Sequence, residues 1–263
     1  AAVRPELFGP LIIPGSPLSY WAGVEGENPM RYTGGLAGGS WMTALMGDLG
    51  GGTLDGASLV GNFENLNPAN TLWTKNYALW AKVDTEQQRF LEFEKWWGGH
   101  IKLNAAEMQW IVDQLFVGNH LATAEIVTSD GARVDLRNIR SPILCFCSKG
   151  DNITPPAQAL GWIIDLFGSD EDLLASGQTI VYAIHEHIEF GSNIDLIDVL
   201  PPGLYEAVMT PKTAEVANPE LVSGDWIVRF ERRTLNDIRA IVHPDPENER
   251  RFATVRRVSE INL

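Results

Sequence analysis

The sequence predicts an α/β protein in which a parallel sheet carries a large, mostly helical insertion. Three short apolar runs, at residues 11–13, 143–147 and 178–184, are bounded by Gly, Pro or polar residues and are typical of strands covered on both faces of a parallel sheet. Between the first two runs, residues 20–120 hold seven of the nine tryptophans. The chain of 263 residues is 44% hydrophobic, which suits one large domain with an insertion.

The insertion is expected to consist of helices with recognisable ends. The capping-box pattern Thr85-x-x-Gln88 predicts the start of one helix, which Gly98 ends. The pattern Asn104-x-x-Glu107 predicts the start of the next. Aromatic residues repeat at helical spacing in this segment, and such stripes more often pack in a core than bind a ligand. We therefore expect a Trp-rich helical cap.

The chain returns to strand-like patterns after residue 120. Residues 122–136 contain an Asp130-Gly131 turn and predict a β-hairpin. The strand at 143–147 is followed by a Pro-rich loop and a helix at 157–167, then by the strand at 178–184. This order predicts four segments. They are a first core strand (1–19), the helical cap (20–120), the α/β core (121–205) and a charged C-terminal extension (206–263).

Charge and cysteine content narrow the functional classes. The net charge of −14 disfavours a nucleic-acid partner, because an acidic surface repels phosphate. No apolar run approaches the ~18 residues of a membrane span, and the start has no signal-peptide pattern. Cys145 and Cys147 are expected to be buried free thiols in a reducing compartment. These features predict a cytoplasmic protein, and no cofactor is indicated.

Two residues at strand ends suggest catalysis. Asp151 follows the strand at 143–147, and His185 ends the strand at 178–184. Working residues of open parallel sheets lie beyond the carboxyl ends of the strands. An acid followed by a His is the second half of the nucleophile–acid–His order, in which the acid orients the imidazole. We therefore predict Asp151 and His185 as catalytic residues, although the chain contains no G-x-S-x-G or G-x-C-x-G nucleophile motif.

Several longer motifs make a family resemblance specific. These motifs are PLSYWAG (17–23), NFENLNPANTLW (62–73), WWGG (96–99), GDNITPP (150–156) and DLIDVLPPGLY (195–205). Through them the chain resembles, over nearly its whole length, the polyhydroxyalkanoate synthase-like family of bacterial α/β-hydrolase-fold proteins. The resemblance implies the later half of an α/β-hydrolase parallel sheet with a large, mostly helical, Trp-rich cap. It also implies acyl transfer or hydrolysis on 3-hydroxyacyl thioesters or related esters.

The chain departs from this family at two positions. The family's nucleophile elbow lies just before the sequence segment that matches residues 1–9, so the chain is expected to begin after this elbow. The family's catalytic His lies in a Gly-His-Leu-Gly segment shortly after the equivalent of Glu186, whereas here Glu186 is joined directly to His187. Of the family's triad, Asp151 alone is carried over cleanly.

Two alternatives to the hydrolase hypothesis stay open. His185, His187 and Glu189 would face one side of an extended strand, and two His with one carboxylate form a known facial metal set for iron, zinc or manganese. The chain could instead be a non-catalytic scaffold that binds a partner through its Trp-rich cap. Under each of these hypotheses, the sheet made of the predicted strands has an open edge. A partner chain, a second copy or further residues would cover this edge.

Overall fold

The computed structural model places most of the chain and forms two compact units. The described residues are 1–23, 37–151, 153–185, 194–215, 217–218, 220 and 226–263. The first unit contains Ala1–Gly39 and Asp113–Asn262, and the second contains Ser40–Val112.

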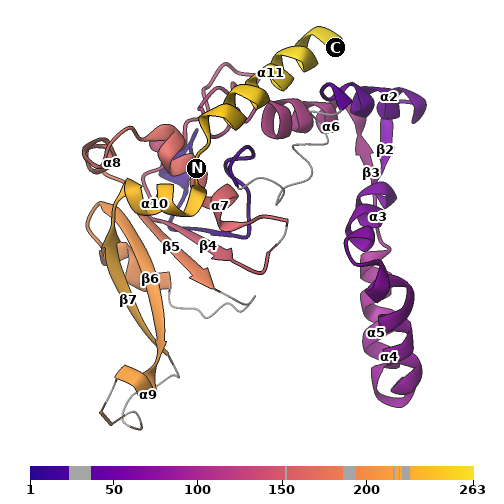
Figure 1. Cartoon of the computed structure of the whole chain (residues 1–263), viewed down its shortest axis with the longest axis horizontal. Helices are drawn as coiled ribbons and strands as arrows, with labels where there is room; N and C mark the ends of the chain where they lie inside the picture. The colour runs from indigo at the N-terminus through magenta and orange to yellow at the C-terminus, as the bar shows by residue number, and fades with distance from the viewer. Residues whose placement is uncertain (24–36, 152, 186–193, 216, 219, 221–225) are drawn as a thin grey trace. The chain divides into compact units, whose positions relative to one another are not determined.

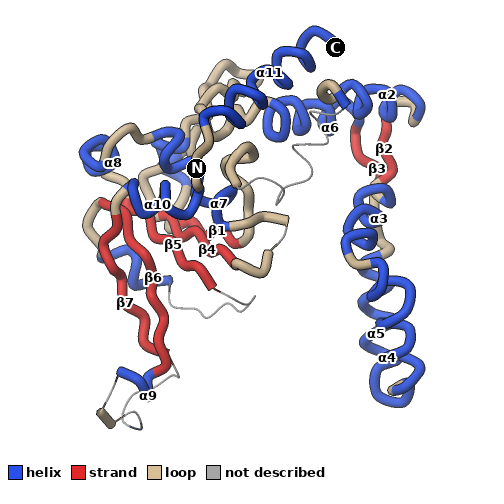
Figure 2. Tube along the Cα trace, viewed as in Figure 1, coloured by secondary structure: helices blue, strands red, loops and turns tan. Residues whose placement is uncertain are grey.

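The first unit is built on a five-stranded, mainly parallel sheet (Figures 1 and 2). Its strands lie in the order β1 (Leu11–Pro14), β4 (Ile143–Ser148), β5 (Thr179–His185), β6 (Gly203–Pro211) and β7 (Trp226–Arg233). The first four run parallel to one another, and β7 pairs with β6 in the antiparallel sense. The prediction of an α/β protein with a mainly parallel sheet is therefore confirmed.

Both faces of the central strands are covered, which explains their uninterrupted apolar sequences. On one face, Cys145 and Tyr182 pack with Leu160 of α7 and Ile238 of α10. On the other, Val181 and its neighbours pack against the short helix η5. Successive side chains of a strand point to opposite faces, so each central strand must be apolar at both alternating sets of positions.

The helices of the first unit follow their sequence signals at several ends. They are η1 (Pro5–Leu7), η3 (Val112–Val117), η4 (Leu136–Asn138), α7 (Pro156–Leu166), α8 (Asp170–Ser176), η5 (Ile194–Val199), α9 (Lys212–Glu215), α10 (Leu235–Val242) and α11 (Pro246–Asn262). A Pro occupies the first position of α7, where its missing N–H costs nothing. Ser169 caps α8 through its hydroxyl group, and Thr234 with Asp237 forms a capping box at α10.

The second unit combines helices with a two-stranded antiparallel sheet. Its elements are α2 (Trp41–Leu49), β2 (Thr53–Asp55), α3 (Ala57–Leu66), η2 (Asn70–Thr74), α4 (Lys75–Ala81), α5 (Val83–Trp97), β3 (Lys102–Asn104) and α6 (Ala105–Ile111). It lies inside the 20–120 segment that the sequence assigns to a cap. Gly47 lets α2 approach α6, because a Cβ at this position would lie 2.7 Å from the Cβ of Ala105. Asn104 caps α6, because its side-chain oxygen accepts hydrogen bonds from the N–H groups of Ala106 and Glu107, as its capping pattern predicts.

Two local predictions need correction. Residues 122–136 do not form a hairpin of two strands; they form one isolated antiparallel bridge between Val127 and Arg133. Asp130 instead accepts a hydrogen bond from the Thr128 hydroxyl group, so the Asp-Gly signal marks a tight turn without a ladder. The helix expected from Thr85 begins two residues earlier, at Val83, and no side chain caps it.

The described part of the chain contains no helix that is both long and apolar enough to cross a membrane.

Candidate functional site

The two predicted catalytic residues lie at the same edge of the sheet. His185 is the last residue of β5 and lies opposite Ser148, the last residue of β4. Asp151 follows three residues after Ser148. The backbone N–H of Lys149 donates a 2.8 Å hydrogen bond to the carbonyl oxygen of His185, which ties the loop after β4 to the end of β5. Parallel pairing of β4 and β5 therefore brings the two segments together, as the sequence predicts.

Asp151 is held by the backbone of its own loop. Its Oδ1 accepts hydrogen bonds of 2.9 Å from the N–H groups of both Ile153 and Thr154. These bonds fix the carboxylate within the loop that joins β4 to α7. Asp151 therefore has a structural role in this loop in addition to any chemical one.

The second oxygen of Asp151 lies toward the end of β1. A Cβ built on Gly15 would come within 3.3 Å of Asp151 Oδ2, and Gly15 has a φ of +51°, a conformation that favours glycine. The Gly15 N–H donates a 2.9 Å hydrogen bond to the carbonyl oxygen of Phe146 in β4. This bond fixes the turn after β1 to the neighbouring strand of the sheet. Three strand ends thus lie at one edge of the sheet, where Gly15 approaches Asp151 and His185 ends the neighbouring strand β5.

The thiols near this edge are unsuited to nucleophilic attack. Cys145 and Cys147 are buried and free, as the sequence predicts. Burial raises the pKa of Cys145 to about 12, and burial together with nearby Cys145 and Asp151 raises the pKa of Cys147 as well. A thiol attacks as its thiolate, so neither group is activated at neutral pH.

The alternative metal site includes two residues, His187 and Glu189, that lie outside the described residues. The grouping of these residues with His185 stays a prediction. Within the part of the chain that the structure describes, no three His, Cys, Asp or Glu side chains gather as a metal site.

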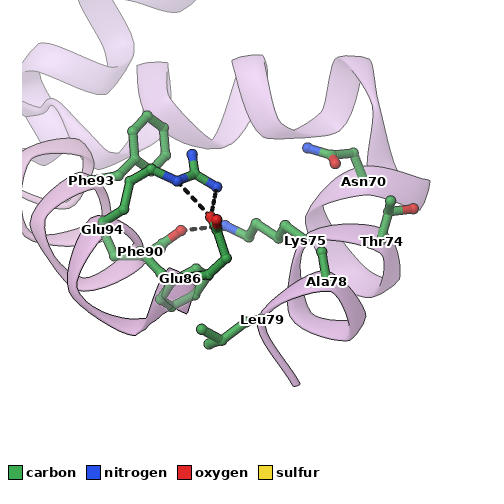
Figure 3. Close-up of a pocket in the computed structure, with 10 residues that line it drawn as sticks. Asn70, Thr74, Lys75, Ala78, Leu79, Glu86, Phe90, Phe93 and Glu94 are labelled. Atoms are coloured by element: carbon green, nitrogen blue, oxygen red, sulfur yellow. Dashed lines mark hydrogen bonds and ion pairs between the residues drawn. The ribbon is translucent and has the colours of Figure 1, made fainter. Parts of the chain in front are cut away.

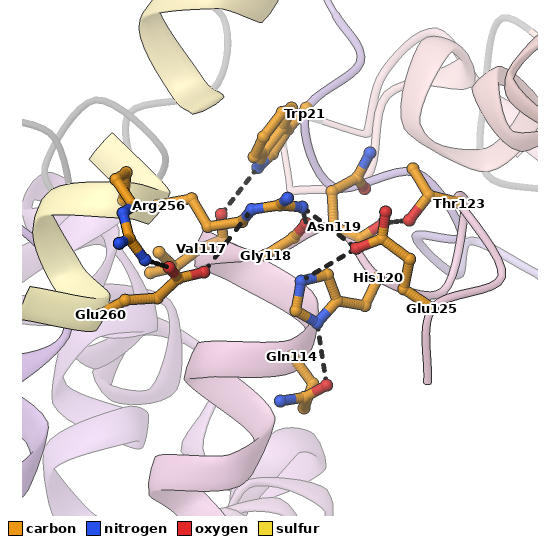
Figure 4. Close-up of polar contacts among 11 residues, drawn as sticks. Trp21, Gln114, Val117, Gly118, Asn119, His120, Thr123, Glu125, Arg256 and Glu260 are labelled. Carbon is orange, nitrogen blue, oxygen red and sulfur yellow. Dashed lines mark hydrogen bonds and ion pairs between the residues drawn. The ribbon is translucent and has the colours of Figure 1, made fainter. Parts of the chain in front are cut away.

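A second polar cluster, around His120, also belongs to the first unit (Figure 4). The ring of His120 lies between two acceptors, with Nδ1 2.8 Å from Gln114 Oε1 and Nε2 3.4 Å from Glu125 Oε2. Arg256 of α11 reaches Glu125 at 3.2 Å and the carbonyl oxygen of Gly118 at 3.4 Å. Burial lowers the pKa of His120, and Glu125 partly opposes this change. The cluster connects the loop after η3 to the C-terminal helix.

A third pair joins the segment after β1 to α7. The Ser19 hydroxyl group, which is almost fully buried, donates a 2.7 Å hydrogen bond to Asp165 Oδ2. Asp165 keeps solvent access, yet the protein atoms around its carboxyl group raise the pKa to about 6. Gly161 permits this approach, because a Cβ there would lie 3.0 Å from Ser19 Cβ and 2.7 Å from Ala22 Cβ.

These additional contacts leave little or no signal in the sequence. Ser19 and Asp165 are 146 positions apart and belong to no common motif. Gly15 does have a signal, since the Pro14-Gly15 pair after a predicted strand marks a turn, but the partner of that turn depends on strand order. His120 and Glu125 are close in sequence, and a His with an acid nearby was the available signal.

The second unit contains a shallow recess between α4 and α5 with a volume of about 330 Å³ (Figure 3). Lys75 of α4 crosses it to form a 2.9 Å ion pair with Glu94 of α5. Arg89 and Glu86 pair at its rim. The polar groups of the recess therefore engage one another, and the recess offers no preformed constellation for catalysis.

Comparisons with known proteins place the chain in a family without assigning it an activity. A protein from Rhizobium meliloti, described as an uncharacterized protein in the ackA 5′ region, is 65% identical over an alignment of 280 positions. The alignment includes all of this chain but only 38% of the relative, so the chain spans well under half of the relative's length. No solved structure matches the chain. The family model DUF3141, described as a protein of unknown function, matches residues 1–263, and the chain therefore belongs to the DUF3141 family.

Proposed function

We propose that this chain forms the acid–base half of an α/β-hydrolase-type active site that transfers or hydrolyses acyl groups in the longer protein. The observation that carries the proposal is the position of Asp151 and His185 at the carboxyl ends of adjacent parallel strands. In such a site, the acid keeps the imidazole in one tautomer and stabilises the imidazolium that forms during the reaction. We propose Asp151 as the orienting acid.

The order of elements supports this proposal. A strand, a helical insertion, a strand followed by Asp, a helix and a strand ending in His follow one another along the chain. This is the order expected of the later half of an α/β-hydrolase, with the second unit as its cap. Among the described residues, β1 pairs with β4 alone, so its other edge can receive a preceding strand. We propose that this strand carries the nucleophile.

The relative has additional residues that bear on the identity of the base. The alignment with the Rhizobium protein has 280 positions against 263 residues here, so 17 positions have no counterpart in this chain. The resemblance to polyhydroxyalkanoate synthase-like proteins implies a His segment directly after Glu186. We propose that His185 marks the strand end from which the base is presented, and that 3-hydroxyacyl thioesters or related esters are the substrates.

The replacement Asp151→Asn in the full-length protein tests this assignment sharply. Asn retains an Oδ1 that can accept the Ile153 and Thr154 N–H groups, but it removes the negative charge. We expect unchanged folding and a fall of about 10⁴ in turnover of a 3-hydroxyacyl thioester, as in triads whose Asp becomes Asn. Asp151→Ala should lose the loop hydrogen bonds as well and reduce stability.

The exposed turn residue Asp130 provides the matched control, since Asp130→Asn removes the same charge away from the strand ends. An active-site acylation probe should label the wild type and the Asp130 variant equally. Full activity of Asp151→Asn, together with a loss of stability in Asp151→Ala, would leave Asp151 a structural residue and overturn the proposal. Failure of any acyl ester or thioester to react with the wild type would favour the scaffold alternative. Stoichiometric iron, zinc or manganese that is lost on His187→Ala would favour the metal site.

A further inference from the structure

The C-terminal helix α11 contacts both of the connections through which the chain enters and leaves the second unit. The chain enters that unit after Gly39 and leaves it before Asp113. We define the outgoing connection as residues 37–39 and the returning connection as residues 113–120. Both connections and α11 lie within the first unit, so their mutual contacts belong to one compact body.

The outgoing connection lies directly against the last turns of α11. Gly39 has a φ of +113°, and a Cβ on it would lie 2.6 Å from the Cα of Ser259. Ser259 is only 2% exposed. Asn262 Nδ2 donates a 3.0 Å hydrogen bond to the carbonyl oxygen of Gly38. The backbone of this connection therefore approaches α11 to a distance that only glycine permits.

The same face of α11 holds the returning connection through an aromatic contact. The ring of Phe252 packs against the ring of Trp21, with their centroids 5.7 Å apart. Trp21 in turn donates a 3.2 Å hydrogen bond from Nε1 to the carbonyl oxygen of Val117. Phe252, Arg256 and Ser259 follow one another at intervals of four and three residues, which places them on one side of the helix.

The polar contact of this face is shared with a titratable group (Figure 4). Arg256 Nη1 lies 3.4 Å from the carbonyl oxygen of Gly118 and 3.2 Å from Glu125 Oε2. The same Glu125 oxygen lies 3.4 Å from His120 Nε2. A protonated imidazole attracts this carboxylate more strongly than a neutral one does, and it places a second cation beside Arg256. Protonation of His120 therefore weakens the hold of Arg256 on the returning connection.

Four charged groups surround His120. Arg256 and Glu260 belong to α11, Glu125 to the loop after η3, and Asp113 to η3 itself. Burial lowers the pKa of His120 most, and the effect of Arg256, which also lowers it, exceeds the opposing effect of Glu260. Release of α11 lets water reach the ring and removes both of these charges, so the protonated form becomes more favourable. Protonation and release therefore favour each other.

We infer that α11 is a releasable strap that holds both connections of the second unit, and that protonation of His120 loosens it. Among the described residues, the hydrophobic clusters on the two faces of the sheet include α7 and α10 but no residue of α11. Release of α11 can thus occur without unfolding of the sheet. The inference does not depend on the proposed acyl-transfer activity.

A cysteine placed at position 259 measures release of the strap. Ser259→Cys puts a thiol where the native side chain is 2% exposed, whereas the native Cys145 and Cys147 are buried in β4 and react only when the sheet opens. Peptide mass spectrometry after labelling with 4,4′-dithiodipyridine gives a rate for each thiol, taken relative to its rate in urea at the same pH. We expect the new thiol to react at least about tenfold faster than the native thiols at about pH 7.5, and faster still at about pH 5.5.

Two pairs of variants test the contact and its control by pH. Gly39→Ala places a Cβ against Ser259 and should speed labelling of the new thiol by more than about tenfold at both pH values. Gly131→Ala is its control, because Gly131 has a φ of +86° but open space around the missing Cβ. His120→Gln keeps a polar side chain that cannot be protonated, so it should remove the pH dependence. His100→Gln, in the second unit, should retain this dependence.

Hydrogen exchange tests whether the two connections are released together. Gly39→Ala should speed amide exchange in both connections and leave β4 and β5 as protected as in the wild type. Asn262→Ala removes only the hydrogen bond to Gly38 and is the milder variant, with an effect in the same direction. Faster exchange in the outgoing connection alone would overturn the strap, as would a thiol at position 259 that reacts no faster than Cys145 and Cys147. An unchanged pH dependence in His120→Gln would overturn the role of His120.

Discussion

Gly15 lies directly against the side chain of Asp151, although 135 residues separate them in the sequence. A Cβ on Gly15 would approach Asp151 Oδ2 to 3.3 Å, and the two backbone N–H bonds to Oδ1 limit how far the carboxylate can retreat. The turn after β1 and the loop after β4 therefore define each other's shape. A substitution at either position should be felt at the other.

The replacement Gly15→Ala should destabilise the protein through two additive causes. The positive φ of +51° costs about 1–2 kcal/mol for a residue with a Cβ, and the contact with Asp151 adds to it. Gly177→Ala separates these causes, because Gly177 has a φ of +75° and open space around its missing Cβ. Urea denaturation should show a larger loss for Gly15→Ala. Equal losses would mean that the Asp151 carboxylate yields freely.

The Asp165 carboxyl group should make stability depend on pH. Its pKa is raised to about 6, above the usual value of 3.8, because surrounding protein atoms partly desolvate the carboxyl group, so the folded state binds its proton more tightly than the unfolded state does. The stabilising contribution is complete below pH 3.8 and is lost as the pH rises through about 6. Asp165→Asn should remove this loss, so its stability relative to the wild type should increase from pH 4 to pH 7. Urea midpoints measured across this range provide the test.

Ser19→Ala is the companion to this experiment. The Ser19 hydroxyl group donates a hydrogen bond to Asp165 Oδ2 and lowers the pKa of this carboxyl group. Removal of the hydroxyl group should therefore raise the pKa and shift the pH-dependent loss of stability to higher pH. A pH profile that is the same in wild type and Asp165→Asn would show that solvent screens this carboxylate fully.

The central strands could be predicted because burial on both faces leaves a direct trace in the sequence. Residues 11–13, 143–147 and 178–184 agree with β1, β4 and β5 to within one or two positions. The outer strands β6 and β7 were not predicted, since their residues were assigned largely to a charged extension. Their charges are paired across the ladder, as in the 2.8 Å contact between Arg233 and Glu206. Such pairing is visible only once the two strands are aligned.

The candidate site was predictable in its outline and not in its contacts. Asp151 and His185 follow from the rule that functional residues lie beyond strand ends, which needs only the order of elements. The hydrogen bonds of Asp151 to the N–H groups of Ile153 and Thr154 could be suspected from the loop sequence. The approach of Gly15 could not, because it depends on β1 and β4 being neighbours in the sheet.

The ionisation of His120 should respond to Arg256 and not to its neighbour Arg257. Burial lowers the pKa of His120 first, and the Arg256 charge lowers it further. Arg256→Gln should therefore raise this pKa toward 6.5, as followed by NMR titration of the imidazole. Arg257 is 73% exposed and pairs with Glu260, so Arg257→Gln serves as the control.

The lowered pKa of His120 also determines how its protonation changes the stability of the fold with pH. The unfolded chain binds a proton at His120 more readily than the folded protein does, so stability is lost as the pH falls below 6.5. Arg256→Gln should reduce this loss. Equal His120 titration curves in the two Arg variants would contradict the assigned role of Arg256.

Asn119 should be sensitive both to the loss of its side chain and to the loss of its backbone conformation. It is 4% exposed, has a φ of 53°, and its Oδ1 accepts a 2.7 Å hydrogen bond from the Tyr20 N–H. Asn119→Gly keeps the backbone conformation but leaves the Tyr20 N–H without this acceptor, at a cost of about 1–3 kcal/mol. Asn119→Ala loses the same acceptor and adds about 1–2 kcal/mol, because Ala disfavours a positive φ. Urea denaturation should therefore rank the proteins as wild type, Gly variant and Ala variant in decreasing stability. If the Ala variant equals the Gly variant, the turn relaxes to another conformation, and if the Gly variant equals the wild type, water replaces the Asn119 amide at the Tyr20 N–H.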